Sequence, residues 1–128
     1  MKLINKKNEL VIKYFENKEY GVRSETNYKD GKPHGKEIIY WEGGKKHKVW
    51  NYKKGLLHGD FENFNPNGTL YSNGKFKEGK IKECHYYCHI NNQKQQSMIF
   101  KKGLIEVIDY NPENGKIVST KNIIPEKH

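Results

Sequence analysis

The stretch Tyr28-Lys29-Asp30-Gly31-Lys32-Pro33-His34-Gly35 returns 24 residues later as Tyr52-Lys53-Lys54-Gly55-Leu56-Leu57-His58-Gly59. The aromatic residue and its glycine recur at the same spacing, giving the pairs Tyr28 with Gly31, Tyr52 with Gly55, Phe76 with Gly79, and Phe100 with Gly103. A fixed period of this length is typical of stacked repeat proteins. Because each repeat is a packing unit, we expect function to reside on the surface that the repeats build together.

Each repeat divides into two units of 12 residues. Tyr40 and Phe64 stand twelve positions after Tyr28 and Tyr52, and each precedes a turn sequence, Glu42-Gly43-Gly44 or Asn65-Pro66-Asn67-Gly68. A unit of this length holds a strand of about five or six residues and a short loop. The chain contains no alanine, while glycine and tyrosine are abundant. The pattern predicts an all-β protein: a single elongated antiparallel meander of about eight to ten strands, open and twisted or curled.

The repeats span most of one domain, residues 1–128. We place them at about 28–51, 52–75, 76–99 and 100–120, between a degenerate N-terminal cap over 1–27 and a tail over 121–128. The segment 10–15 in the cap is expected to form an earlier strand of the same sheet. The third repeat is eroded, because Cys88 replaces the aromatic residue and Asn91-Asn92 replaces the glycine turn.

Only 34% of the residues are hydrophobic, which makes a large closed core improbable. A repeat sheet needs less, since it can cover one face with a row of aromatic side chains and leave the other face wet. The expected core consists of Tyr28, Ile38, Tyr40, Tyr52, Phe61, Phe64, Leu70, Phe76, Tyr86 and Phe100.

The two complete stretches resemble the Tyr-x-x-Gly-x-x-x-Gly core of MORN repeats. The double unit of 24 residues, with its turn at Asn67-Gly68-Thr69-Leu70, is similar to the MORN-variant repeats of bacteria. The resemblance covers roughly residues 14–115 and weakens where Lys82-Glu83 and Glu106-Val107 replace His-Gly. It implies an antiparallel meander that contacts proteins or membranes, and proteins of that group are often labelled antitoxins or immunity proteins.

The formal net charge is +9. A solvated surface is the favoured interpretation of that charge, because the lysines are scattered with acids interleaved, and an acidic protein partner comes second, ahead of nucleic acid or an anionic membrane. Nucleic acid is the least favoured, because Arg23 is the single arginine and arginine is the residue that reads phosphates and bases in a bidentate way. The apolar run in 10–12 is too short for a signal sequence, so we expect a cytoplasmic protein.

The stretch Cys84-His85-Tyr86-Tyr87-Cys88-His89 is the one that resembles a metal site. In a strand, Cys84 and Cys88 would lie about 13 Å apart, and His85 and His89 would face the other way. A zinc ion needs all of its ligands within about 2.3 Å. We therefore expect no metal, no cofactor and two free thiols, which suits a reducing compartment. A transient redox site or an adventitious metal is the alternative.

No catalytic motif is recognisable, so we expect a protein that is not an enzyme and that binds another protein. The leading hypothesis is an antitoxin or immunity role, in which the sheet masks a toxin and the lysines help to attract an acidic one. The alternative is a peripheral scaffold on anionic membrane lipid. The candidate binding residues are Trp41, Trp50, His34, His58, Tyr71 and Tyr87, because large aromatics are frequent hot spots. Each tryptophan has a second interpretation, packing within the aromatic row, and each histidine another, capping a hairpin beside Gly35 or Gly59.

Overall fold

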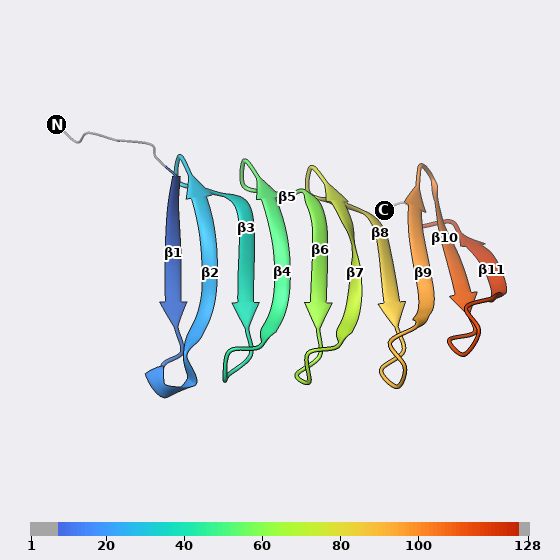
Figure 1. Cartoon of the computed structure of the whole chain (residues 1–128). Helices are drawn as coiled ribbons and strands as arrows, with labels where there is room; N and C mark the ends of the chain where they lie inside the picture. The colour runs from blue at the N-terminus through green and yellow to red at the C-terminus, as the bar shows by residue number, and fades with distance from the viewer. Residues whose placement is uncertain (1–7, 126–128) are drawn as a thin grey trace.

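The computed structural model describes residues 8–125 as a single antiparallel sheet of eleven strands (Figure 1). Neighbouring strands follow one another in chain order, except that the short β5 pairs only with β4. A single 3-10 turn, η1 (Lys18–Tyr20), lies between the first two strands. The strands are β1 (Asn8–Tyr14), β2 (Val22–Lys29), β3 (Lys32–Tyr40), β4 (Lys46–Lys53), β5 (Leu56–Leu57), β6 (Gly59–Phe64), β7 (Leu70–Lys77), β8 (Lys80–Tyr87), β9 (Lys94–Lys101), β10 (Leu104–Tyr110) and β11 (Ile117–Ile123).

The architecture confirms the predicted all-β meander. The sheet is open, because β1 and β11 lie at opposite ends of the row and do not pair with each other (Figure 1). It has one strand more than the upper end of the expected range, because His58 separates the two-residue β5 from β6. The segment predicted as an early strand lies mostly within β1, and β11 extends into the residues that the sequence assigned to a tail.

The turns differ at the two ends of the strands. Gly31, Gly55, Gly79 and Gly103 all have positive φ, between 78° and 85°, in two-residue turns at one end. Longer loops join the strands at the other end (Figure 1). We call these ends the tight-turn edge and the loop edge. In the loops, asparagine side chains accept bonds from backbone N–H groups two residues on, as Asn67 does from Thr69, and such bonds stabilise turns.

The repeat aromatics share one face of the sheet. Cross-strand partners in an antiparallel pair lie on the same face, and so do residues two apart along a strand. The pairs Thr26–Glu37, Glu37–Trp50, Gly74–Cys84, Cys84–Met98 and Met98–Val107 therefore define a row on one face. The four repeat aromatics come two residues after members of this row and lie beside it. We call this side the aromatic face and the other side the opposite face.

The core differs from the expected one. Of the ten residues predicted for the core, only Phe61 is fully buried, with 4% of its surface exposed. The other nine are half-buried, because a single-layer sheet has no second layer to cover large side chains. Apart from Phe61, the buried residues have small or medium side chains: Thr26, Val49, Ser72, Cys84, Cys88, Ser97 and Val107.

Gly74 marks the tightest point of the sheet. Its strand partner is Phe61, whose ring lies over the position that a side chain would occupy. A Cβ atom there would lie 2.8 Å from the Phe61 ring and would overlap the backbone oxygen of Glu83. The absence of a side chain at Gly74 is what allows Phe61 to be buried.

Candidate functional site

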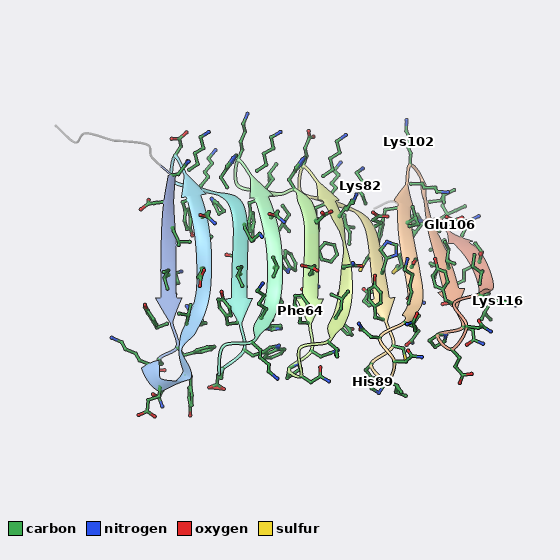
Figure 2. The ribbon with its side chains drawn as sticks, viewed as in Figure 1. Phe64, Lys82, His89, Lys102, Glu106 and Lys116 are labelled. Carbon is green, nitrogen blue, oxygen red and sulfur yellow. The ribbon has the colours of Figure 1, made fainter. Side chains whose placement is uncertain are left out.

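Three of the predicted binding residues meet around one hollow near the loop edge of the sheet. Trp41, Trp50 and Tyr71 come from the β3–β4 loop, β4 and β7, and line a depression of about 410 Å³. Phe64, labelled near the loop edge in Figure 2, also lines it. The remaining lining residues are His47, Lys48, Asn63, Asn65 and Pro66.

Trp50 forms the floor of this hollow and is fixed by packing. Its ring centroid lies 5.7 Å from those of Phe61 and Phe76. Its indole N–H donates to Asn63 Oδ1 at 3.0 Å, and the Asn63 amide in turn donates to Ser72 Oγ. Both the ring and the polar group of Trp50 are therefore satisfied within the sheet, which favours the packing interpretation of this tryptophan.

Trp41 is held differently. It lies in the loop after β3 and stacks on His47, with ring centroids 3.6 Å apart and an interplanar angle of 18°. Its indole N–H is buried and has no hydrogen-bond partner among residues 8–125. Burial, and to a smaller extent the charge of Lys48, lowers the pKa of His47, which favours the neutral form of the ring against Trp41. The site thus contains a buried donor that no group in the described part of the chain satisfies, and burying such a donor costs free energy.

Tyr71 links this hollow to a second one. Half of its surface is exposed, and its ring meets Tyr86 edge to face at 5.8 Å. Both Tyr71 and Asn65 also line the second depression, of about 690 Å³, with Tyr86, Tyr87, His89, Gln95, Gln96, Met98 and Asp109. The two depressions together, which we call the aromatic groove, contain Trp41, Trp50 and Tyr71 of the six predicted binding residues. Tyr87 also lines the second depression, but its hydroxyl donates to Asn73 Oδ1 at 3.0 Å in a different hollow.

Two polar networks fix the floor of the second depression. The hydrogen bond with Cys84, burial, and the nearby Cys84 and Tyr71 raise the pKa of Tyr86 to about 12. Asp109 accepts bonds from Gln96 and Ser119, and these bonds lower its pKa. Cys84 and Cys88 are buried and are not joined in a disulfide. Burial raises the pKa of the Cys84 thiol, so this group is a packing element with little thiolate character.

The structure places His34 and His58 far from the groove, at the tight-turn edge. His34 Nδ1 accepts from the backbone N–H of Lys54 at 3.1 Å, and His58 Nδ1 accepts from that of Glu78 at the same distance. Each histidine therefore stabilises the tight turn of the following repeat, 20 residues further along. Capping of a hairpin was an interpretation that the sequence offered, but the hairpin held is the next one and not the histidine's own.

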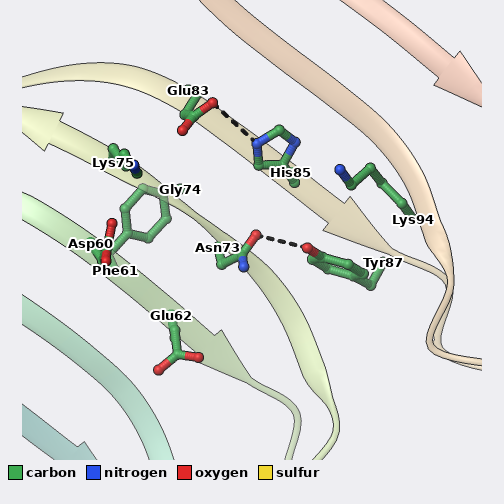
Figure 3. Close-up of a pocket in the computed structure, with 10 residues that line it drawn as sticks. All are labelled: Asp60, Phe61, Glu62, Asn73, Gly74, Lys75, Glu83, His85, Tyr87 and Lys94. Atoms are coloured by element: carbon green, nitrogen blue, oxygen red, sulfur yellow. Dashed lines mark hydrogen bonds and ion pairs between the residues drawn. The ribbon is translucent and has the colours of Figure 1, made fainter.

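A hollow of about 510 Å³ lies across β6, β7, β8 and β9 (Figure 3). Glu83, His85 and Ser97 there form a chain of contacts that the sequence did not reveal. His85 Nε2 lies 3.4 Å from Glu83 Oε2, and His85 Nδ1 lies 2.6 Å from Ser97 Oγ. Alternation along the strand predicted that His85 would face away from Cys84. It could not predict the contact with Ser97, which is 12 residues away in the sequence and is set opposite His85 by the strand register.

An acid, a histidine and a serine in contact are the components of a nucleophilic triad. Here the serine cannot act, because Ser97 has no exposed surface and no substrate can reach its hydroxyl. The trio is therefore better understood as a satisfied polar network beneath the hollow. Among residues 8–125, no group of three or more histidine, cysteine, aspartate or glutamate side chains could hold a metal ion.

Lysines that are scattered in the sequence gather along the tight-turn edge. The four tight-turn segments, 29–32, 53–56, 77–80 and 101–104, carry eight lysines and two acidic residues. The loop segments 15–21, 41–45, 65–69, 88–93 and 111–116 carry three lysines and four acidic residues. Figure 2 shows Lys82 and Lys102 at the first edge and His89 and Lys116 at the other. We call the eight lysines the lysine ridge: Lys29, Lys32, Lys53, Lys54, Lys77, Lys80, Lys101 and Lys102.

No protein-family model matches the chain, and no curated protein matches it. A crystal structure of accessory secretory protein 1, 2 and 3 in Streptococcus pneumoniae is similar, with a TM-score of 0.47 and 16% sequence identity. The similarity covers 90% of this chain and 21% of that chain, so this chain spans about a fifth of the length of the other. Within residues 8–125, no helix is long and apolar enough to cross a membrane.

Proposed function

We propose that the protein is a non-catalytic binding module that holds a protein partner in the aromatic groove. The observation that supports this most directly is the meeting of Trp41, Trp50 and Tyr71 around one hollow near the loop edge. Shallow surfaces bearing aromatic side chains are typical of protein recognition, since tyrosine and tryptophan dominate hot spots. MORN-like repeats and a role as an antitoxin are the specific forms of this proposal, with the partner a toxin whose active site the sheet covers.

The charge distribution supports an acidic partner. A partner that sits in the groove, near the loop edge, is attracted by the overall net charge of +9, since the lysine ridge lies at the tight-turn edge. Such an arrangement steers an acidic protein and raises its association rate more than its final affinity. Salt should therefore slow association with little effect on dissociation.

The test is capture of a partner from the native host, followed by calorimetry with purified variants. Replacing Tyr71 by alanine should weaken binding by about 2 kcal/mol, because an exposed tyrosine at the centre of an interface is a typical hot spot. The matched control is Tyr20→Ala, since Tyr20 is similarly exposed, at 46%, but lies in η1 outside the groove. If Tyr71→Ala and Tyr20→Ala bound the captured protein as tightly as the parent, the groove would not be the binding surface.

A second candidate function is docking on anionic lipid, which the lysine ridge favours. Each repeat aromatic directly precedes a lysine of the ridge, as Tyr52 precedes Lys53, and Leu56 stands half exposed at the same edge. Basic residues bordered by apolar ones are the usual composition of a membrane-surface contact. Each lysine near an anionic surface contributes about 1 kcal/mol.

This alternative is tested with vesicles of phosphatidylserine and phosphatidylcholine in a co-sedimentation assay. The double variant Lys53→Glu with Lys77→Glu should lose most binding to anionic vesicles, by at least about tenfold. The matched control reverses the same number of charges at the loop edge, with Lys45→Glu and Lys116→Glu. Equal losses for the two double variants would mean that net charge acts and not the ridge.

A further inference from the structure

The strand β1 forms one end of the sheet, and its outer side has no partner strand among residues 8–125 (Figure 1). It is also apolar, because Leu10, Ile12 and Tyr14 have 53%, 43% and 53% of their surface exposed. An exposed edge with apolar side chains presents unpaired backbone groups to any strand that can match it. The question is which strand would match.

The strand register assigns the side chains of β1 to its two faces. Leu10 and Ile12 pair with Asn27 and Glu25 and lie on the opposite face. Glu9, Val11 and Lys13 alternate with them and lie on the aromatic face. If two copies of the chain extend one sheet about a twofold axis, residues directly across the axis must lie on the same face. The axis must therefore pass through a residue of β1, because an axis between two residues would pair side chains of different faces.

We propose that β1 pairs antiparallel with β1 of a second copy, with the twofold axis at Val11. In this register Leu10 stands across from Ile12 of the second copy on the opposite face. On the aromatic face Glu9 stands across from Lys13 of the second copy. Symmetry produces each pair twice, so Leu10 and Ile12 meet each other and each charge meets its opposite, while Tyr14 stands across from Asn8.

The two neighbouring registers lack the ion pairs of this one. With the axis at Leu10, Glu9 stands across from Val11, and with the axis at Ile12, Lys13 stands across from Val11. Opposite-charge and apolar cross-strand pairs each stabilise a sheet, whereas a charge opposite an apolar residue gains neither contribution. In the isolated chain, neither Glu9 nor Lys13 takes part in an ion pair among the described residues, so both are available.

The other end of the sheet does not match itself in this way. All seven residues of β11 are exposed, and Lys121 is its one charged residue. A twofold axis at Thr120 would place Lys121 across from Ser119 with no ion pair. A lone lysine on an edge is a device that discourages pairing. The charges therefore select β1, and pairing through β1 alone closes the assembly as a dimer and not as an open chain.

The experiment is sedimentation equilibrium of the full chain over a wide concentration range. The parent should change from the mass of one chain to that of two, without larger species. Lys13→Glu puts two carboxylates across from each other at two places and should raise the dissociation constant about tenfold. Combining Glu9→Lys with Lys13→Glu exchanges the charges and should restore the parent value. Lys121→Glu on β11, at the other end of the sheet, is the matched control and should leave the dissociation constant unchanged.

The register has its own test. Residues directly opposite in an antiparallel pair have Cα atoms about 4.5–5.5 Å apart, which is within reach of a disulfide. Val11→Cys should therefore form a disulfide-linked dimer on mild oxidation, whereas Ser119→Cys should stay monomeric. The native thiols do not compete because Cys84 and Cys88 are buried. A parent that stays monomeric throughout, masses above two chains, or equal sensitivity to Lys121→Glu would each overturn the proposal.

Discussion

At the scale of single residues, Trp41 and Trp50 show how one residue type can fill two roles. The ring of Trp50 packs on two phenylalanines and its N–H is bonded to Asn63, so it belongs to the framework of the sheet. Trp41 stacks on His47, and its indole N–H is buried without a hydrogen-bond partner among residues 8–125. This unpaired donor opposes folding. The arrangement of Trp50 stabilises the fold, whereas the indole N–H of Trp41 contributes no stability.

Trp41→Phe is expected to keep the chain as stable as the parent or to stabilise it. The phenylalanine ring can still stack on His47, while the buried donor is removed, and a buried donor without a partner costs about 1–3 kcal/mol. The measurement is urea denaturation followed by circular dichroism. The control is Trp50→Phe, which removes a satisfied donor and leaves Asn63 Oδ1 unbonded, and should destabilise the chain. A clear loss of stability for Trp41→Phe would mean that the indole packing outweighs its unpaired N–H.

Tyr86 makes the stability sensitive to alkali. Its pKa is about 12 in the folded chain, whereas the ordinary pKa of a tyrosine, which applies in the unfolded chain, is 10.0. Between these values the folded chain keeps a proton that the unfolded chain releases, so the free energy of unfolding falls as the pH rises. The contribution is complete below pH 10.0 and is lost as the pH passes about 12. The pKa values of Tyr40 and Tyr52 are raised by burial and by nearby carboxylates, which acts in the same direction.

Denaturation midpoints should therefore decrease through this alkaline range, and Tyr86→Phe should make the decrease smaller. Lysines lose their charge in the same range, but they do so in both proteins, and the difference between the two curves isolates Tyr86. Tyr20→Phe is the matched control, since Tyr20 is exposed on η1. Parallel curves for the parent and Tyr86→Phe would show that this phenol titrates alike in both states.

At the scale of elements, the tight turns are held by the preceding repeat. Both residues of the turns Lys54-Gly55 and Glu78-Gly79 have positive φ, which is unusual for lysine and glutamate. The N–H groups of these two residues are the ones bonded to His34 and His58. In the next repeat Lys82 occupies the histidine position, and Lys102, 20 residues on, is not among the described residues with positive φ. Asp30, in the first tight turn, also has positive φ, although Leu10 stands 20 residues before it, so the histidine bond accompanies two of the three tight turns of this shape.

His58→Ala should destabilise the chain by about 1 kcal/mol, because the Glu78 N–H loses its acceptor. His58→Asn offers an acceptor oxygen in a similar position and should recover part of the loss. His89→Ala is the control, since His89 is exposed in the β8–β9 loop. The measurement is the midpoint of thermal unfolding. Equal midpoints for His58→Ala and the parent would show that this bond to the turn contributes nothing.

The repeat pattern was sufficient to predict the elements but not the contacts between them. Aromatic and glycine positions fix the strand length and the turn type, so the meander and the positive-φ glycines were predictable. Which small residues are buried was not, because Ser97 is covered by neighbours from other strands. Cross-strand neighbours likewise decide which site residues could be predicted. Trp41 and Tyr71 were predicted as large exposed aromatics, whereas the Glu83–His85–Ser97 contact depends on cross-strand register, which spacing alone does not encode.

At the scale of the whole molecule, stability should vary along the row of strands. A single-layer sheet resembles a linear array in which each element is supported mainly by its neighbours. Phe61, Ser72, Cys84 and Ser97 are buried on β6 to β9, whereas six of the seven residues of β1 and all of those of β11 are exposed. Local opening should therefore be most costly in the middle and cheapest at the two ends.

Amide hydrogen exchange of the full chain should accordingly give the greatest protection in β6 to β9 and the least in β1 and β11. Increasing the protein concentration separates the two ends. If β1 joins a second copy, its amides gain protection as the dimer forms, while those of β11 do not, and Lys13→Glu removes the gain. Protection that is uniform along the chain would contradict the array description. If the gain in amide protection with concentration were confined to β11, the dimer would form through β11. The charges of β1 could then not be the cause of pairing.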